Sequence, residues 1–362
     1  MASVASFGTA GVVALVAGTV CLTSGCGMLG YYTQSVGGHL AIVRSARPVP
    51  DWLADDATPA ALKQRLQLSQ RIRDYAVTQL GEPDNASYRR YADLQRGAAV
   101  WNVVAAPELS LTLQTWCFPV VGCVGYRGYY ARADADAFGT TLREQGKDVS
   151  VYGVPAYSTL GLLPFEAFAD PLLNTFIDYP EGELAKLIFH ELAHQIAFAK
   201  GDTVFNESFA TAVERIGSAR WLVERADAKA REDFERFEVR RADFRALTAR
   251  YRDEFNALYG GAASDAAKRA GKAALMARLR TDYASLKTDR WGGFSGYDGW
   301  FARANNASFG ALAAYDELVP DFERLFEREG RDFARFYAEV KRLAALPETE
   351  RRSGLRWDQA FR

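Results

Sequence analysis

Only three histidines occur in the chain, and the spacing of two of them constrains the fold more than any other feature. His190 and His194 are four positions apart, so in a helix of 3.6 residues per turn their side chains lie on one face. Residues 181–200 carry the signals of such a helix, because Pro180 and two acidic residues begin it and Gly201 follows it. Apolar residues on both sides of the histidine pair predict that the helix is buried and rigid.

Glu191 lies beside the histidine pair and completes a pattern with a definite chemical use. Two neutral imidazoles on one helix face can bind one zinc ion, and Glu191 is then placed to accept a proton from a water molecule on that ion. Zinc lowers the pKa of such a water toward about 7, which makes hydroxide available near neutral pH. The pattern predicts hydrolytic chemistry with Zn2+ as cofactor, His190 and His194 as ligands and Glu191 as the general base.

Glu207 is the best candidate for a third metal ligand, since a catalytic zinc usually has three protein ligands and one open position. The remaining histidine, His39, is far away in the sequence and is expected to be structural or at the surface. Glu207 begins a second predicted helix after a turn at Gly201. Glu214, two turns later on the same face, is predicted to accept a hydrogen bond from a ligand imidazole. The alternatives are an acid favoured by the helix dipole at Glu207 and a solvated charge at Glu214.

The amino-terminal segment has the features of an export signal. Residues 1–25 carry no charged side chain, and residues 11–22 are nearly all apolar, a run shorter than the about 20 residues that span a bilayer. Small residues then precede Cys26, which is typical of a bacterial lipoprotein signal cleaved before a lipid-carrying cysteine. This predicts a protein anchored to the membrane through Cys26, facing the periplasm of the bacterial cell envelope, at the outer membrane. An ordinary signal peptide and an uncleaved anchor remain alternatives.

Cysteine usage and charge agree with an exported globular protein. Cys117 and Cys123 are separated by a segment with Pro and Gly, so a local disulfide is expected in an oxidising compartment, with two buried thiols as the alternative. Apolar residues make up 49% of the chain, enough for a sizeable core. The formal net charge is −1, and no dense basic patch indicates a nucleic acid partner. No oligomeric state is indicated.

Local patterns predict an α+β protein with a small antiparallel sheet beside the metal-binding helix and a mainly helical carboxy-terminal half. The expected strands cover residues 100–104, 109–115, 123–130 and 148–154, and the expected helices residues 60–80, 131–146, 181–200, 206–225 with Asn206 as its N-cap, 226–258, 266–286 and parts of 321–346. The expected regions are the signal (1–25), a lead-in (26–59), the catalytic region with the metal site (60–225), a long helical hairpin (226–290) and a helical region that completes the catalytic domain (291–362).

The chain resembles a known group of enzymes in the residues that surround this pattern. Residues 190–195 followed by 206–210 resemble the gluzincin arrangement of thermolysin-like zinc metallopeptidases. More closely, and over nearly its whole length, the chain resembles the bacterial lipoproteins described as predicted aminopeptidases. That resemblance is carried by residues 30–40, 116–123, 154–161 and 304–307. It implies a zincin-like fold and an aminopeptidase that hydrolyses peptide or protein substrates at the cell envelope.

The resemblance also implies where substrate binds. Such peptidases hold an extended peptide along an edge strand before the metal helix, and residues 149–154 fit that place, with Val151 and Gly153 in its middle. Asn305 and Asn306 are expected either to bind the substrate backbone or to cap a helix.

Two further functions need residues near the metal. Tyr157 and Tyr315 are the candidates for the donor that stabilises the oxyanion, although each is also compatible with a packed tyrosine. An aminopeptidase needs a carboxylate for the free α-amine, and Glu166 and Asp170 are available, although simple loop solvation is favoured for both. The sequence therefore leaves endopeptidase activity as an alternative. A third interpretation is a non-catalytic envelope lipoprotein with a structural zinc site and a partner-binding hairpin, which would have no use for Glu191.

Overall fold

The computed structural model describes residues 30–118, 122–156 and 169–356, without the side chains of residues 313–316. The protein is α+β, as the sequence predicts. Its main sheet has the order β6-β3-β7 with both pairings antiparallel, and its strands are β3 (Val100–Pro107), β6 (Arg127–Tyr129) and β7 (Lys147–Val154). Two smaller sheets contain β1 (Arg47–Pro48), β2 (Arg90–Ala92) and β8 (Leu172–Leu173), and β4 (Trp116–Phe118) and β5 (Gly122–Val124).

Both faces of the main sheet are covered, because alternate residues of a strand point to opposite sides. Val103 and Ala105 pack with Val149 under α4 (Arg132–Glu144). On the other face, Val104 and Ala106 pack against Ala307 of α10 (Asn306–Asp316). Toward the Val100 end, this second face is free of α10 and forms part of the cavity described below.

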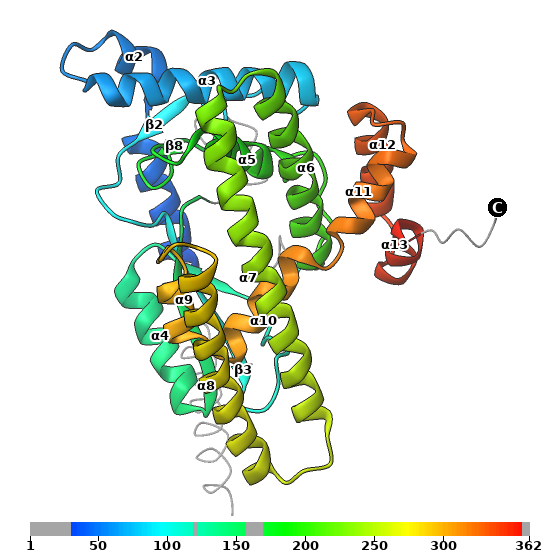
Figure 1. Cartoon of the computed structure of the whole chain (residues 1–362). Helices are drawn as coiled ribbons and strands as arrows, with labels where there is room; N and C mark the ends of the chain where they lie inside the picture. The colour runs from blue at the N-terminus through cyan, green and yellow to red at the C-terminus, as the bar shows by residue number, and fades with distance from the viewer. Residues whose placement is uncertain (1–29, 119–121, 157–168, 357–362) are drawn as a thin grey trace, which may run out of the picture.

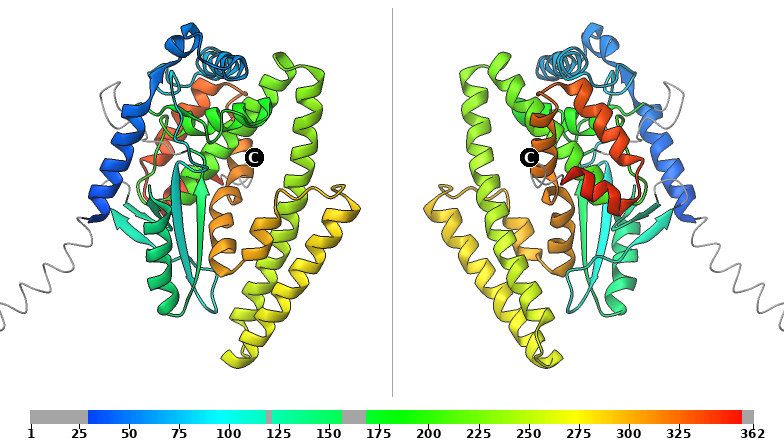
Figure 2. Two further views of the ribbon diagram at one scale, coloured as in Figure 1. Left: turned by 90° about the vertical axis from the view of Figure 1, so that its left-hand side faces the viewer. Right: turned by 90° about the vertical axis from the view of Figure 1, so that its right-hand side faces the viewer.

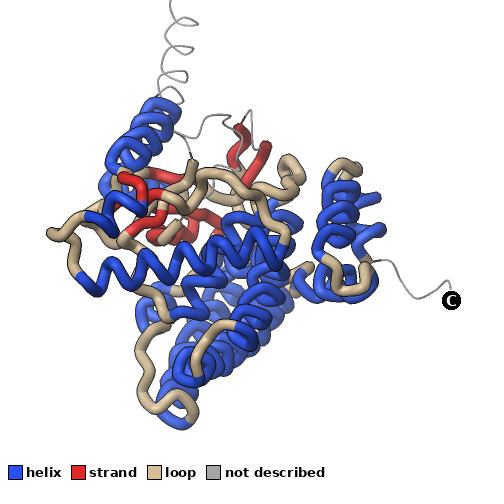
Figure 3. The backbone as a smooth tube through the Cα atoms, turned by 90° about the horizontal axis from the view of Figure 1, so that it is seen from above, coloured by secondary structure: helices blue, strands red, loops and turns tan. Residues whose placement is uncertain are grey.

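The largest core surrounds two central helices, α5 (Glu181–Ala193) and α6 (Thr203–Glu224). Around them lie α2 (Val49–Ala54), α3 (Ala60–Leu80), α11 (Val319–Arg328), α12 (Phe333–Ala344) and α13 (Glu348–Leu355). Figure 3 shows α11 to α13 gathered at one side of the molecule. Phe189, Phe205, Phe209, Phe322 and Phe336 are almost completely buried where these helices meet. Burial of such large apolar side chains holds α5 and α6 in fixed positions.

A second core belongs to the long helical hairpin, which leans outward from the rest of the molecule (Figure 2). Its helices are α7 (Ala228–Gly260) and α8 (Asp265–Asp289), followed by α9 (Asp298–Arg303). Tyr251, Phe255 and Leu279 from the hairpin pack with Phe301 and Phe309 from α9 and α10. The hairpin is thus joined to the body through α9 and α10. Among the described residues no helix combines the length and the apolar character needed to cross a bilayer.

Most predicted elements are present, and residues 30–59, for which the sequence predicts only a lead-in, contain two helices. Residues 30–45 form a helix, drawn in dark blue in Figure 1, and α2 follows it. Ile42 and Ala46 enter the main core, which fixes the helix in place. A Cβ atom at Gly38 would lie 2.1 Å from the Tyr130 ring, so the glycine that reads as a helix breaker allows close packing instead.

Three other local predictions also need correction. Residues 109–115 form no strand. The Gln114 N–H donates to the Ala105 carbonyl. Leu111 is buried in the hairpin core, and Leu113 packs between the main sheet and α10 in the cluster of Val104 and Ala307. Helix α5 ends at Ala193 rather than near residue 200. The N-cap of α6 is Asp202, whose side chain accepts from the Phe205 N–H at 3.0 Å, and not Asn206.

Candidate metal centre and its cavity

A short turn between α5 and α6 folds the second helix back over the first. Gly201 has a φ of +80°, a conformation that favours glycine. Asn206 accepts from the Ala199 N–H at 2.8 Å and donates to the Ala199 carbonyl at 2.9 Å. Asp202 is buried and holds Arg351 at 2.6 Å and Arg352 at 2.7 Å. These interactions fix the first turn of α6, and Glu207 with it, beside the end of α5.

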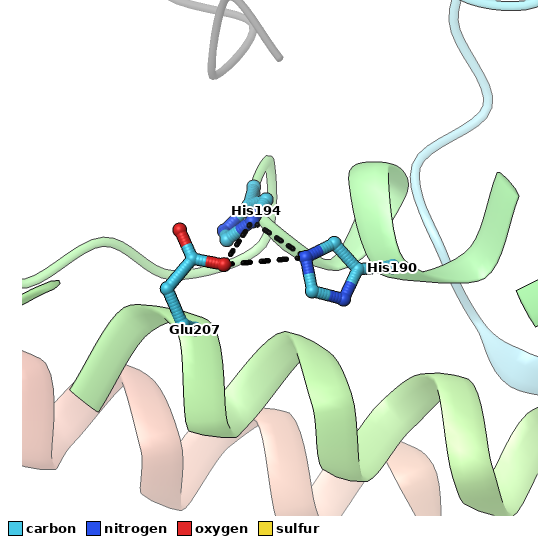
Figure 4. A group of neighbouring side chains, drawn as sticks. All are labelled: His190, His194 and Glu207. Carbon is cyan, nitrogen blue, oxygen red and sulfur yellow. Dashed lines mark hydrogen bonds and ion pairs between the residues drawn. The ribbon is translucent and has the colours of Figure 1, made fainter. Parts of the chain in front are cut away.

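Glu207 meets the two histidines, as Figure 4 shows. Ligand atoms of His190, His194 and Glu207 all lie within 4.8 Å of one another. The two Nε2 atoms are 3.2 Å apart, and Glu207 Oε2 is 3.4 Å from Nε2 of His190 and 3.8 Å from that of His194. Donor atoms 2.0–2.1 Å from a tetrahedral zinc ion lie about 3.3 Å apart. The three residues therefore fit a zinc ion in both donor type and spacing.

Glu214 lies behind His190 and determines which nitrogen faces the other donors. His190 Nδ1 is 3.0 Å from Glu214 Oε2, so Nδ1–H donates to the carboxylate and Nε2 is left as the ligand atom. Burial opposes ionisation of Glu214, but Lys186 and His190 bring its pKa down to about 2. Lys186 is 3.4 Å from Glu214 and 2.9 Å from Glu238. Glu214 is therefore a paired, half-buried carboxylate and not a solvated helix charge.

The charges around the three candidate ligands favour a cation between them. Burial alone would lower the pKa of His190, but hydrogen bonds to Glu207 and Glu214 raise it well above its ordinary value. Burial lowers the pKa of His194 to about 4, which keeps this imidazole neutral. Burial opposes ionisation of Glu207, yet His194 and His190 hold its pKa below the ordinary value. A neutral imidazole and an ionised carboxylate are the forms in which these groups bind a metal.

Glu191 lies in the same cavity but outside the group of three ligand residues. Burial raises the pKa of its carboxyl to about 8; the charge of His190 opposes the shift, while Glu207 and Asp170 add to it. A carboxylate with a raised pKa binds a proton more strongly than an exposed one, which suits it to general base chemistry. Its carboxylate remains available for an incoming molecule.

The cavity in front of these residues has a volume of about 510 Å³, within the range of small-molecule sites. Asn102 and Val154 of the main sheet form one wall, and Tyr31, Tyr126 and Tyr130 form another. Burial raises the pKa of Tyr126, and the charges of Glu207 and Glu191 raise it further. Its hydroxyl thus stays protonated and able to donate a hydrogen bond near both carboxylates.

Comparison with known protein families finds one match. Residues 30–355 match the model of the family described as "Putative aminopeptidase". The chain belongs to this aminopeptidase family. It matches none of the curated proteins and none of the solved structures with which it was compared. The family description supports peptidase activity.

The predicted peptide-binding residues of this aminopeptidase family member lie away from the metal-facing wall. The side chain of Val151 packs in the α4 core, and a Cβ atom at Gly153 would meet Ala98 and Trp101. Asn305 caps α10 and donates to the Val149 carbonyl at 2.9 Å. Asn306 is completely buried and donates to the carbonyls of Pro107 and Glu108. Both amides are thus used within the fold, and Val154 is the β7 residue that lines the cavity.

Several other predicted residues lie outside the described part of the chain. Tyr157, Glu166 and Cys26 belong to segments that the structure does not describe, and the side chain of Tyr315 is not described either. Asp170 is 2% exposed, with the Gln195 amide 3.4 Å from its carboxylate. Cys117 and Cys123 form a disulfide, and the Gly122 beside it closely approaches Gly201 in the turn before α6.

Tyr126 is the main residue that sequence reasoning missed. It follows Gly125 in a segment rich in aromatic residues, and nothing in its immediate sequence separates it from tyrosines that only pack. Tyr126 could be identified as a site residue only once the β5–β6 connection is known to lie beside the end of α5.

Proposed function

We propose that this protein is a zinc-dependent metallopeptidase that acts as an aminopeptidase. The observation that carries the proposal is the convergence of His190, His194 and Glu207 at ligand spacing, with Glu191 beside them and outside the ligand set. A site that served structure alone would be closed by a fourth protein ligand, and it would not need a half-buried carboxylate that lines the cavity without binding the metal. We also propose a zincin-like fold, which the resemblance to gluzincins implies.

The proposed chemistry uses bound zinc and three side chains in different ways. Bound zinc would polarise the scissile carbonyl and make water acidic enough to attack near neutral pH. Glu191 accepts the proton of the attacking water and returns it to the leaving amine. Glu214 keeps His190 in the tautomer whose Nε2 faces the cavity. Tyr126 takes the role first sought in Tyr157 and Tyr315, and donates a hydrogen bond to the developing oxyanion.

The family description favours removal of amino-terminal residues. An endopeptidase of the same chemistry is the alternative, and a blocked amino terminus separates the two. An aminopeptidase cleaves aminoacyl substrates and loses activity when their α-amine is acetylated, whereas an endopeptidase cleaves internally quenched peptides with or without acetylation. We also propose that Cys26 carries lipid and places the enzyme on the periplasmic side of the envelope.

The direct test is the Glu191→Gln variant, analysed for bound metal and for peptide hydrolysis. We expect zinc to be retained at about one ion per chain, while kcat falls about 10²- to 10⁴-fold, the usual contribution of a general base. Glu232→Gln is a matched control, because Glu232 is 68% exposed on α7. Peptidase activity that survives Glu191→Gln at the wild-type level would refute the proposed base. Wild-type protein that binds no zinc would refute the metal site.

A further inference from the structure

A second cavity shares part of its wall with the cavity at the candidate metal centre. Its volume is about 660 Å³. Tyr126 and the turn formed by Gly201, Asp202 and Thr203 are part of the wall of both cavities. A ligand that passes this shared wall would have one end at the candidate metal centre and the other end in the second cavity.

The second cavity is largely apolar, with one cation that lacks a counter-charge. Val104, Leu113 and Phe309 line it, and Arg252 enters it from α7. Arg252 is half-buried, and within the described part of the chain it has neither a hydrogen bond nor an ion pair. Partial burial of an unpaired guanidinium costs free energy, unless a ligand supplies the missing hydrogen bonds and negative charge.

The acidic groups of this cavity do not supply that counter-charge, because each lies beside another arginine. Asp202 is shared by Arg351 and Arg352, so two cations face one carboxylate. Glu317 is 3.9 Å from Arg356, and Glu348 is 3.9 Å from Arg352. The lining therefore leaves Arg252 available to a ligand anion. A guanidinium binds a carboxylate through two parallel hydrogen bonds, which gives this pair its specificity.

We propose that the second cavity is a substrate subsite in which Arg252 binds a carboxylate of the peptide. This inference rests on the proposed peptidase function. The carboxylate at the carboxy terminus of a short peptide fits the arrangement, since a cation in a cavity that shares part of its wall with the metal-side cavity would fix the distance between the scissile bond and the end of the peptide. The preferred substrates are then short peptides with a free carboxy terminus, and not long chains or folded proteins.

The test compares peptides of increasing length, each with a free or an amidated carboxy terminus, on full-length zinc-loaded protein. At the length that spans the two cavities, we expect kcat/KM for the free acid to exceed that for the amide by about ten- to hundredfold. Arg252→Met should abolish this preference. Arg250→Met is the matched control, because Arg250 lies on the same helix but pairs with Asp282 outside the cavity, and it should retain the preference.

A third set of peptides distinguishes the source of the carboxylate. An amidated peptide with Asp or Glu near its end that recovers the full rate, in a way that needs Arg252, supports the subsite and assigns it to a side-chain carboxylate. Equal rates for acids and amides at every length overturn the proposal. A preference that survives Arg252→Met also overturns it.

Binding measured without turnover separates this inference from the peptidase proposal. Calorimetry on zinc-loaded Glu191→Gln protein should show tighter binding of the acid than of the amide, and the difference should disappear in the Glu191→Gln, Arg252→Met double variant. If wild-type protein hydrolyses no peptide but this difference is present, the subsite stands and the proposed activity fails. If hydrolysis occurs but acid and amide bind equally, the subsite fails alone.

Discussion

The helix pairs α5–α6 and α7–α8 are both rich in charged residues, but they place those charges in opposite environments. In the first pair, Lys186 has a side chain only 5% exposed and contacts the carboxylate of Glu214. In the second pair, Lys229 is 78% exposed and contacts Asp233 one turn away. Water screens the surface pair, whereas the buried pair interacts strongly and is costly to break. The contribution of an ion pair to the stability of this fold therefore depends on how deeply the pair is buried, and not on how many ion pairs a region contains.

The two regions meet where the start of α7 packs against α5. Arg241 of α7 bonds Glu183 of α5 at 2.6 Å, and Glu238 contacts both Lys186 and Arg241 at 2.9 Å. A continuous set of ion pairs therefore connects the hairpin to Glu214, and through it to His190. The exposed pair of Lys229 and Asp233, at the first turns of α7, has no such connection among the described residues, so the two groups should respond very differently to substitution.

The largest effect on stability is expected from Lys186→Met. This change leaves the half-buried Glu214 without its lysine, while Glu238 keeps Arg241, and it costs about 3 kcal/mol or more in the free energy of unfolding. Urea denaturation of the metal-free variant and wild type measures the difference. A loss below about 1 kcal/mol would show that the buried network behaves like a surface pair, and the comparison would break down.

Glu214→Gln should have an intermediate effect, mainly on metal binding. The amide is a weaker acceptor for His190 Nδ1–H, and loss of such a partner lowers metal affinity about 10- to 100-fold. Competition with a chromophoric zinc chelator measures the affinity, and circular dichroism checks that the variant is folded. Unchanged zinc affinity would mean that Glu214 does not orient His190.

The smallest effect is expected from Lys229→Met. Its ion pair with Asp233 lies one turn apart on an exposed helix surface, where such pairs contribute at most about 0.5 kcal/mol. The unfolding free energy should change by no more than that, and the remaining contribution should decrease as salt is added. A loss comparable to that of Lys186→Met would contradict the role assigned to burial.

Elements that depend on local signals could be predicted from the sequence. Helices α3 and α8, and strands β3 and β7, lie close to their expected positions, because apolar periodicity and turn residues determine them within a few turns of chain. His190, His194 and Glu207 were accessible for a similar reason. Helical spacing brings the histidines together, and one short turn brings the next helix back beside them.

The rest depends on contacts between distant segments. Residues 109–115 have the composition of a strand, yet their apolar side chains are buried against helices that come much later in the chain. Tyr126 becomes a cavity residue only because the β5–β6 connection lies beside α5 and α6. Arg252 lies 58 positions after His194 in the sequence, and no local pattern marks it as a cation without a partner. Tertiary packing overrides local preference at each of these places.

The helix formed by residues 30–45 contributes Tyr31 and Ser35 to the wall of the metal-side cavity, so the proposed active site and the proposed lipid site are close in the sequence. Only five positions separate Tyr31 from Cys26, a tether that extends at most about 18 Å. If Cys26 carries acyl chains, as we propose, the metal-side cavity would lie close to the lipid headgroups. The membrane would then hinder large folded proteins from reaching the cavity, whereas small molecules that diffuse along the membrane surface could enter it.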